Sequence, residues 1–264
     1  MSTATQIALE GASKEFVGRG ETVLALQPTS IEIARERFVA LVGPSGCGKS
    51  TVLNMIAGLQ QPTSGRVVYD GNLVTGPNRQ VGYMTQKDTL LPWRSVADNI
   101  GLALELKIRS TSRSDRDNRV AQMIELVGLK GFERHYPGEL SGGMRKRVSL
   151  ARSLIYEPET LLMDEPFAAL DAQLRLVMHD ELLRLTRLRR MTVVFVTHDL
   201  GEAITLADLV VVFTGRPGRI KTLREIPLAH PRDAFRLRFS EDFARLHEEL
   251  WNELKDEVAK GTDR

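Results

Sequence analysis

Residues 43–50 read Gly-Pro-Ser-Gly-Cys-Gly-Lys-Ser (GPSGCGKS), and this stretch decides the fold. It matches the pattern GxxxxGK[ST] at every fixed position, and it lies between an apolar run at 38–42 and a helix-like stretch at 51–59. Glycines in such a loop let successive N–H groups point at phosphate oxygens, and the following helix start adds partial positive charge. The sequence therefore predicts a phosphate-binding loop, with a chance glycine-rich turn as the alternative.

Side chains within this loop suggest more than phosphate binding. Lys49 can reach the β- and γ-phosphates of a nucleotide, and the Ser50 hydroxyl can ligate Mg²⁺. Cys47, which is the single cysteine of the chain, has two interpretations. It is either a thiol made reactive by the helix start, which ATP would protect, or an inert small residue.

A pair of carboxylates follows the apolar run at 161–163. Asp164 and Glu165 would lie at the carboxyl end of a buried strand, which is the edge where α/β sheets bind ligands. Asp164 is then a candidate Mg²⁺ ligand, and Glu165 a candidate general base for the attacking water. Two ordinary strand-end charges are the alternative, but the phosphate-binding loop favours the functional interpretation.

Two further polar residues follow apolar runs in the same way. His198 comes after the run at 193–197, and its side chain can contact a γ-phosphate as donor or as cation. Gln86 follows the run at 81–84, where its amide can reach Mg²⁺ or the water. The alternatives are a structural histidine and a polar strand cap.

Bulk composition limits the classes of function. The 264 residues carry a formal charge of +2, which argues against a dedicated nucleic-acid binder. One cysteine allows no internal disulfide, which fits a reducing compartment. The first residues lack the pattern of a signal peptide, and we find no apolar stretch of about 18 residues that would span a membrane.

The order of apolar runs predicts an α/β fold. Short apolar runs alternate with helical patterns, which is typical of a mainly parallel sheet covered on both faces. Between about 95 and 157 helical patterns dominate, so we expect a helical insertion there. From Asp233 onward we expect an amphipathic helical tail, and the pattern leaves open whether it packs on the core or on another subunit.

Residues 139–147 (ELSGGMRKR) predict a second helix start suited to an anion. Ser141 is a good N-cap, and Gly142 and Gly143 leave backbone N–H groups uncovered. This signal is weak by itself, because glycine pairs at helix starts are common.

The ordered set of motifs resembles the ATP-binding subunits of ABC transporters. The set comprises GPSGCGKST, Gln86, LSGGM, LLMDEP, AALD and the Thr-His pair at 197–198. The resemblance implies a P-loop NTPase of the ABC-cassette fold over residues 5–230. Its sheet core is mainly parallel, with an N-terminal antiparallel β subdomain, a helical subdomain inserted at about 88–157, and a C-terminal helical tail at 231–264.

The resemblance also implies cofactors and site residues. ATP and Mg²⁺ would lie between two copies, or between one copy and a similar ATPase subunit, arranged head to tail. Each ATP would be held by the phosphate-binding loop of one subunit and the LSGGM of the other. Phe16 would stack on adenine, for which a half-buried strand residue is the alternative. Catalytic roles fall to Glu165, His198, Gln86 and Lys49, and metal binding to Ser50, Gln86 and Asp164. The remaining nucleotide-contacting residues are Gly43, Pro44, Ser45, Gly46, Cys47, Gly48, Thr51, Ser141, Gly142, Gly143 and Asp171.

Three positions depart from the family pattern. Met144 stands where Gln is common, and Ala168 where Ser is frequent, so each removes a possible polar contact. Glu36-Arg37 replaces a common Gly-Glu, which puts the local turn in doubt.

Within the family, the resemblance is closest to importers of nitrate, sulfonate, taurine and related anions. It implies an ATPase on the cytoplasmic face of the membrane, working with a permease, a separate solute-binding protein and no nucleic acid. The apolar segment 90–93, with Trp93 as an aromatic anchor, is the predicted permease dock, with a small satellite core as the alternative. An exporter or lipid-trafficking ATPase, a soluble non-transport ABC ATPase and a non-hydrolysing nucleotide clamp remain alternative functions.

Overall fold

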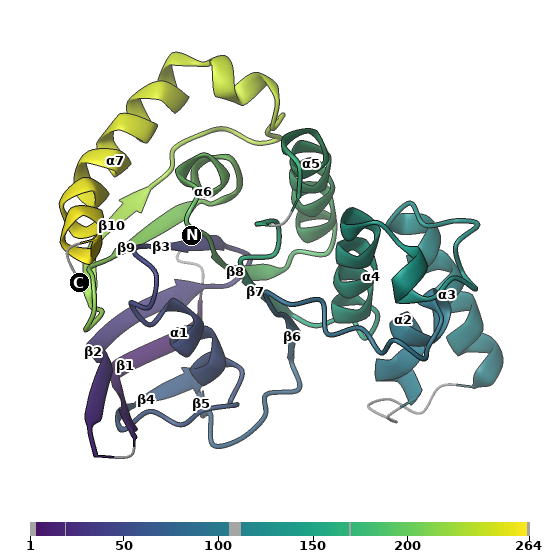
Figure 1. Ribbon diagram of the computed structural model, residues 1–264, viewed down its shortest axis with the longest axis horizontal. Helices are drawn as coiled ribbons and strands as arrows, with labels where there is room; N and C mark the ends of the chain where they lie inside the picture. Colours follow the sequence, from purple (N-terminus) through teal and green to yellow (C-terminus); the bar gives the residue numbers. More distant parts are fainter. Residues whose placement is uncertain (1–3, 19, 106–111, 169, 263–264) are drawn as a thin grey trace.

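The computed structural model describes residues 4–18, 20–105, 112–168 and 170–262 (Figure 1). Its central feature is a sheet with the strand order β10-β9-β3-β8-β7-β6. Neighbouring strands are parallel except β10, which runs antiparallel to β9 at one edge. The strands are β3 (Phe38–Val42), β6 (Val81–Met84), β7 (Thr160–Asp164), β8 (Thr192–Val196), β9 (Leu209–Phe213) and β10 (Ile220–Glu225).

Alternation of side chains along the central strands divides the core into two layers. Val39 and Leu41 of β3 join one hydrophobic cluster, while Ala40 and Val42 join the other. Both clusters are buried, so these strands are continuous apolar runs rather than alternating ones. The predicted α/β fold with a mainly parallel core is therefore confirmed, and the edge strand β10 is an element that the sequence patterns did not predict.

A second, antiparallel sheet covers one face of the first. Its strand order is β2-β1-β4-β5, formed by β1 (Thr5–Val17), β2 (Thr22–Ala34), β4 (Ser64–Tyr69) and β5 (Asn72–Leu73). Helix α1 (Lys49–Ile56) contacts β4 of this sheet and β7 and β8 of the parallel one. The predicted helix at 51–59 thus begins two residues earlier, and Gly58 follows it in the left-handed region (φ 70°).

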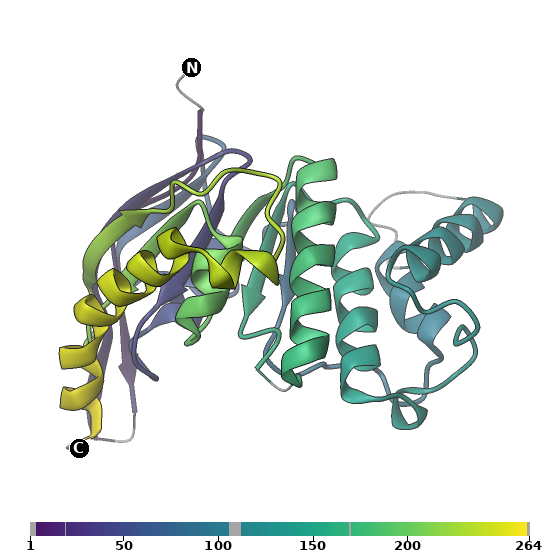
Figure 2. The same ribbon diagram turned by 90° about the horizontal axis from the view of Figure 1, so that it is seen from above.

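The chain between β6 and β7 is helical. It contains α2 (Val96–Glu105), α3 (Arg113–Leu126), the short η1 (Pro137–Glu139) and α4 (Gly142–Leu154). Figures 1 and 2 show α2 and α3 on the far side of α4, away from both sheets. The division into a core domain and an inserted subdomain with the stated bounds stays a prediction.

Helices α5 (Ala172–Leu188), α6 (Leu200–Leu206) and α7 (Glu241–Thr262) cover the other face of the parallel sheet. The C-terminal tail packs back on this core, since Phe243, Leu246, Leu250 and Leu254 of α7 are buried in the same cluster as α6. The expected start of the tail helix at Asp233 was wrong: a short η2 (Arg236–Phe239) follows, and α7 begins at Glu241. The Asp233 carboxylate instead accepts N–H bonds from Phe235 and Arg236 in a tight turn.

The doubtful turn before β3 forms with Glu36 in the left-handed region (φ 60°). Glycine adopts this conformation without strain, which explains why a glycine there would be common. The Glu36 N–H donates to the Thr192 hydroxyl at 2.9 Å, and this bond across to β8 holds the turn.

Candidate nucleotide site

The phosphate-binding loop connects the end of β3 to α1. Gly48 precedes the helix with φ 96°, a conformation that favours glycine. Lys49 is only 6% exposed, and its ammonium donates to the carbonyl oxygens of Gly43 (2.7 Å) and Pro44 (2.8 Å). The lysine charge is therefore held at the mouth of the loop, where a phosphate would meet it.

Backbone donors of this loop are available for a ligand. Among the described residues, no carbonyl or side chain accepts a hydrogen bond from the N–H groups of Ser45, Gly46 or Gly48. The back of the loop is closed by Gly218, because a Cβ at this position would lie 1.8 Å from the Cys47 carbonyl oxygen. Only glycine fits at 218, and this support of the loop was missed by sequence reasoning.

The two interpretations of Cys47 are now distinguishable. The side chain is fully buried, and this burial raises the pKa of the thiol, although Lys49 acts in the opposite direction. A buried thiol with a raised pKa is a poor nucleophile. The reactive interpretation is therefore contradicted, and Cys47 is a small packing residue beneath the loop.

Ser50 and Asp164 form a pair of oxygens beside the loop. The Ser50 hydroxyl donates to Asp164 Oδ1 at 3.0 Å. Burial raises the pKa of Asp164, and the Ser50 hydrogen bond partly opposes that shift. Hydroxyl and carboxylate oxygens are ligands that Mg²⁺ prefers, and a divalent cation would stabilise the ionised, half-buried carboxylate. These residues therefore fit the predicted metal.

Glu165 lies at the centre of the predicted catalytic group. It adopts φ 43°, and its N–H donates to the Val196 carbonyl of the neighbouring strand. Its Oε2 accepts a hydrogen bond from Gln86 Nε2 (3.2 Å) and lies 3.5 Å from His198 Nδ1. The ends of three parallel strands thus bring together Glu165, Gln86 and His198, as their positions after apolar runs predicted.

A buried network holds the His198 turn. The Thr197 hydroxyl donates to Glu202, which is 3% exposed, at 2.6 Å, and also accepts the Asp199 N–H at 3.0 Å. Arg175 of α5 pairs with Asp199 at 3.1 Å and lies 3.7 Å from Glu202. Sequence reasoning missed this network, because its members come from two helices and a strand end.

Helix α4 holds the segment that carries Gln86. Lys146 is 4% exposed, and its ammonium donates to the Gln86 carbonyl (2.6 Å) and pairs with Asp88 (2.9 Å). Ser149 and Arg152 of the same helix donate to the Asp88 carbonyl. The basic residues after the glycine pair in ELSGGMRKR, which include Lys146, were the only sequence signal for these contacts. They did not indicate which residues they would contact.

The start of α4 has the expected cap. The Ser141 hydroxyl accepts the Met144 N–H at 3.3 Å, and Ser141 and Gly142 are exposed. A Cβ at Gly143 would lie 2.0 Å from a Leu174 methyl of α5. No hydrogen bond or ion pair within the described ranges joins residues 141–143 to the chain's own phosphate-binding loop.

The remaining predicted contacts lie on separate elements. Phe16 of β1 is 40% exposed, and the Lys14 ammonium lies over its ring, 5.5 Å from the centroid. Thr51 lies in the first turn of α1. Asp171 caps α5 by accepting the N–H groups of Gln173 and Leu174, an ordinary structural role. Their nucleotide contacts stay predictions.

Comparison with known families decides which protein family the chain belongs to. The family model described as ABC transporter matches residues 26–168, which contain the loop, Gln86, the α4 start and Glu165. The chain belongs to the ABC transporter family. The predicted family is confirmed.

Curated ABC proteins resemble almost the whole chain. An uncharacterized ABC transporter ATP-binding protein of Methanocaldococcus jannaschii is 46% identical, covering 97% of this chain and 93% of that protein. The aliphatic sulfonates import ATP-binding protein SsuB of Bacillus subtilis is 41% identical over 92% of this chain and 91% of its own. The nitrate import ATP-binding protein NrtC of Synechococcus elongatus is 41% identical over 90% of this chain and 36% of its own.

A solved ABC structure confirms the cassette fold. The dimeric, post-hydrolysis structure of the ATP-binding cassette MJ0796, bound to ADP and Pi, superposes with a TM-score of 0.76. It is 29% identical in sequence and covers 84% of this chain and all of that one. The cassette fold predicted from the motifs is therefore confirmed.

Proposed function

We propose that this ABC chain is the ATP-hydrolysing subunit of an importer for a small anionic solute. One observation carries the catalytic part: Glu165 is held between Gln86 and His198, next to a loop with open N–H donors and a lysine at its mouth. Glu165 would accept a proton from the attacking water, while Lys49 and the N–H groups neutralise charge on the γ-phosphate. Mg²⁺, held by Ser50 and Asp164, would supply further charge neutralisation.

Two copies would complete each site. The start of α4 presents exposed Ser141 and Gly142 but does not contact its own phosphate-binding loop. A helix start with free N–H groups suits the γ-phosphate held by a second copy. The dimeric arrangement of the MJ0796 cassette supports this proposal. Asp171, at the start of α5, would lie near the same junction.

A catalytic test follows from Glu165. We expect Glu165→Gln to lower Mg-dependent ATPase activity by about 10²–10⁴-fold, because the amide cannot accept the proton. The matched control is Glu248→Gln, at an exposed position on α7, which should keep wild-type activity. Equal rates in Glu165→Gln and wild type would overturn the base assignment.

The dimer has its own test. ATP bound to the hydrolysis-deficient Glu165→Gln chain should produce a dimer in light scattering after size exclusion. Adding Ser141→Arg should abolish that dimer, since a long cation would occupy the place of the partner's phosphate. A monomer with full ATPase activity would contradict the proposal.

The solute and the partners rest on the relatives. SsuB and NrtC are named as import proteins for aliphatic sulfonates and nitrate, which are both anions. Such a subunit would lie at the cytoplasmic face of the membrane. Its partners would be a permease and a separate solute-binding protein. None of the helices in the described ranges combines the length and apolar character needed to cross a bilayer.

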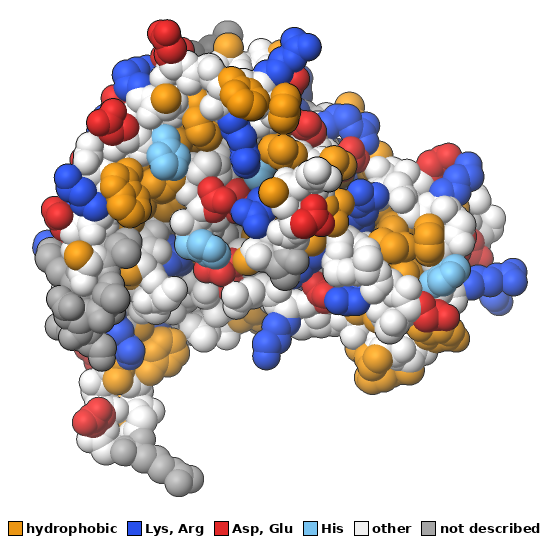
Figure 3. Space-filling view, turned by 45° about the horizontal axis from the view of Figure 1, so that its top comes forward, with side chains coloured by type: hydrophobic (Ala, Val, Ile, Leu, Met, Phe, Trp, Pro, Cys, Tyr) orange, Lys and Arg blue, Asp and Glu red, His pale blue; other side chains and the backbone are white. Residues whose placement is uncertain are grey.

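The segment 90–93 is the proposed permease dock. Trp93 is 71% exposed, while Leu90 packs against the core. The buried Asn99 shapes this segment: its side chain exchanges hydrogen bonds with both backbone groups of Leu91 and also donates to the Arg94 carbonyl. Hydrophobic side chains gather on the surface of the region formed by α2, α3 and α4 (Figure 3).

A charge at this position tests the dock. Trp93→Glu should abolish co-purification with the permease and transport, while the ATPase activity of the isolated subunit persists. Trp251→Glu on α7, where the side chain is 50% exposed, is the matched control. Transport that persists in Trp93→Glu, with hydrolysis still coupled to it, would show that the dock lies elsewhere.

A further inference from the structure

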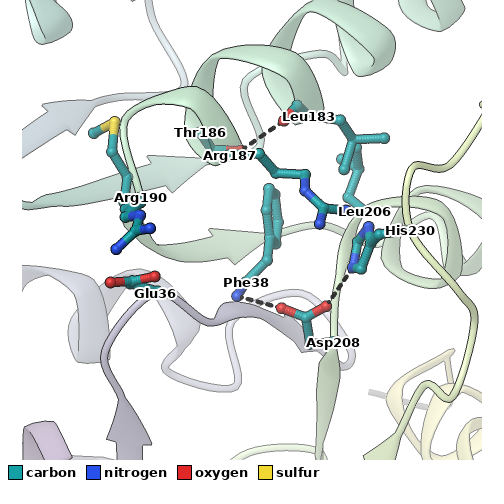
Figure 4. A pocket seen from close by; sticks show the side chains of 10 residues that line it. Glu36, Phe38, Leu183, Thr186, Arg187, Arg190, Leu206, Asp208 and His230 are labelled. Atoms are coloured by element: carbon teal, nitrogen blue, oxygen red, sulfur yellow. Dashed lines mark hydrogen bonds and ion pairs between the residues drawn. The ribbon is translucent and has the colours of Figure 1, made fainter. Parts of the chain in front are cut away.

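A cavity of about 430 Å³ lies at the edge of the parallel sheet opposite to the phosphate-binding loop. We call it the basal cavity; it is formed where β3, β8 and β9 begin and where α5 ends. Figure 4 shows it from close by. The residues used below are Glu36, Phe38, Leu183, Arg187, Arg190 and His230.

Apolar side chains form part of the wall of the basal cavity. Phe38, Leu183 and Leu206 line it and are at most 6% exposed. The Phe38 ring stands in the middle of the view in Figure 4, between Arg190 on one side and Arg187 on the other. A ligand here would therefore meet both apolar side chains and the charged groups at the rim.

The two arginines at the rim have no side-chain partner among the residues that the structure describes. Within the described residues, neither Arg187 nor Arg190 makes an ion pair or a side-chain hydrogen bond, although both line the cavity. The two acidic side chains that line the cavity, Glu36 and Asp208, differ in whether they have partners. Asp208 accepts a hydrogen bond from the Phe38 N–H and pairs with His230, each at 2.9 Å. No ion pair in the part of the chain that the structure describes holds the Glu36 carboxylate, which lines the same cavity.

A second guanidinium increases the positive charge near Arg187. Arg232 is buried, lies 3.7 Å from Asp208 and donates to the Ala207 carbonyl at 2.7 Å. Burial lowers the pKa of Arg232, Asp208 raises it, and Arg187 lowers it further. Arg187 is thus close enough to a buried cation for mutual repulsion, which an anion next to Arg187 would relieve.

We propose that the basal cavity binds a small organic monoanion, with its charged group at Arg187 and its apolar body on Phe38. A multiply charged anion fits less well, because Glu36 faces the same space. A cation is disfavoured by the unpaired arginines. This site lies on the edge away from the nucleotide and does not depend on the proposed function.

Such a ligand would connect two segments that are distant in sequence. Arg187 belongs to α5, whereas His230 belongs to the connection between β10 and the tail and is held in place by Asp208. A ligand that contacts both binds only the folded arrangement, so it should also raise the melting temperature.

Titration calorimetry with hexane-1-sulfonate tests the proposal, in the presence and absence of saturating Mg-ADP. We expect saturable binding in both conditions, and weakening by about 10-fold or more in Arg187→Gln, since a charged hydrogen bond is lost. Glu36→Gln should tighten binding, because it removes a like charge from the rim. Arg184→Gln is the matched control: the same helix and charge change, but a side chain engaged by Glu181 and outside this cavity.

Four results would overturn the assignment. Binding that disappears with Mg-ADP would belong to the nucleotide site. Equal weakening in Arg184→Gln and Arg187→Gln would reveal only general charge attraction. Equal affinity for 1-hexanol would indicate an apolar site without anion selectivity, and a shift in melting temperature that persists in Arg187→Gln would contradict the site in the same way.

Discussion

The two glycine-rich helix starts differ in what their own chain supplies. At α1 the loop contains a cation, because the Lys49 ammonium donates to the carbonyl oxygens of Gly43 and Pro44. At α4 the serine cap satisfies one N–H and nothing in the described chain closes the space in front of it. The first start has its own cation for a phosphate, whereas the second, in the proposed dimer, would contribute to a site on the other copy. Under this proposal, each of the two similar sequence patterns would form one half of a pocket.

The largest effect should come from the cation that only α1 has. Lys49→Met keeps much of the side-chain length and removes the charge, so we expect ATPase activity to fall by about 10²–10³-fold. Lys255→Met on α7, an exposed lysine, is the control and should retain activity. The decisive measurement is steady-state hydrolysis together with nucleotide affinity; unchanged turnover in Lys49→Met would remove the distinction between the two starts.

Loss of the Lys146 contacts, which hold the Gln86 segment on α4, should have the next largest effect. Lys146→Met leaves the Gln86 carbonyl and Asp88 without their buried partner, which should cost about 1–3 kcal/mol of unfolding free energy. Arg147→Met, at the next position of the same helix, controls for loss of charge, because its guanidinium contact to the Val127 carbonyl is long at 3.5 Å. Urea denaturation compares the two. Equal midpoints would show that Lys146 contributes nothing specific.

A smaller effect separates the two glycines of α4. Gly143→Ala would push a methyl group against Leu174, which must move, and we expect about 1 kcal/mol of destabilisation. Gly142→Ala meets its nearest atom at 3.9 Å, in the Arg145 side chain, so better helix propensity should leave it neutral or slightly stabilised. Thermal melts of both variants give the comparison, and a reversed order would indicate that α4 and α5 pack differently at their starts.

The smallest effect concerns the cap. Ser141→Ala removes the acceptor of the Met144 N–H and should lower the unfolding free energy by about 0.5–1 kcal/mol. Ser141→Asn keeps an acceptor and should restore most of it. If ATP-dependent dimerisation also survives Ser141→Ala, the phosphate contact at α4 comes from backbone N–H groups rather than from the hydroxyl.

Local patterns were sufficient for much of this molecule. The phosphate-binding loop, the central strands and the positions of Gln86, Glu165 and His198 were all predictable, because each follows an apolar run and parallel strands end at one edge. Three features were not predictable. The Lys146–Asp88 pair spans 58 residues, the fit of Gly218 depends on a backbone far away in the sequence, and β10 has an alternating pattern typical of an exposed edge. Each depends on tertiary contacts that no local pattern records.

The tail shows the same limit in another form. The helical pattern from residue 233 was correct in kind, but the turn held by Asp233 delays the helix to Glu241. The amphipathic pattern identified an apolar face without identifying what it covers. Only the structure shows that this face is buried on α6.

The left-handed backbone conformation of Glu165 affects how far its side chain can lie from that of His198. Its N–H is bonded to the last residue of β8, two residues before His198, so both side chains are attached to adjacent strands of one sheet. Their separation is then governed by the spacing of neighbouring strands, about 4.8 Å in any protein, and not by the length or sequence of a loop. Mutations in surrounding loops can reorient either group but have little means of moving them apart.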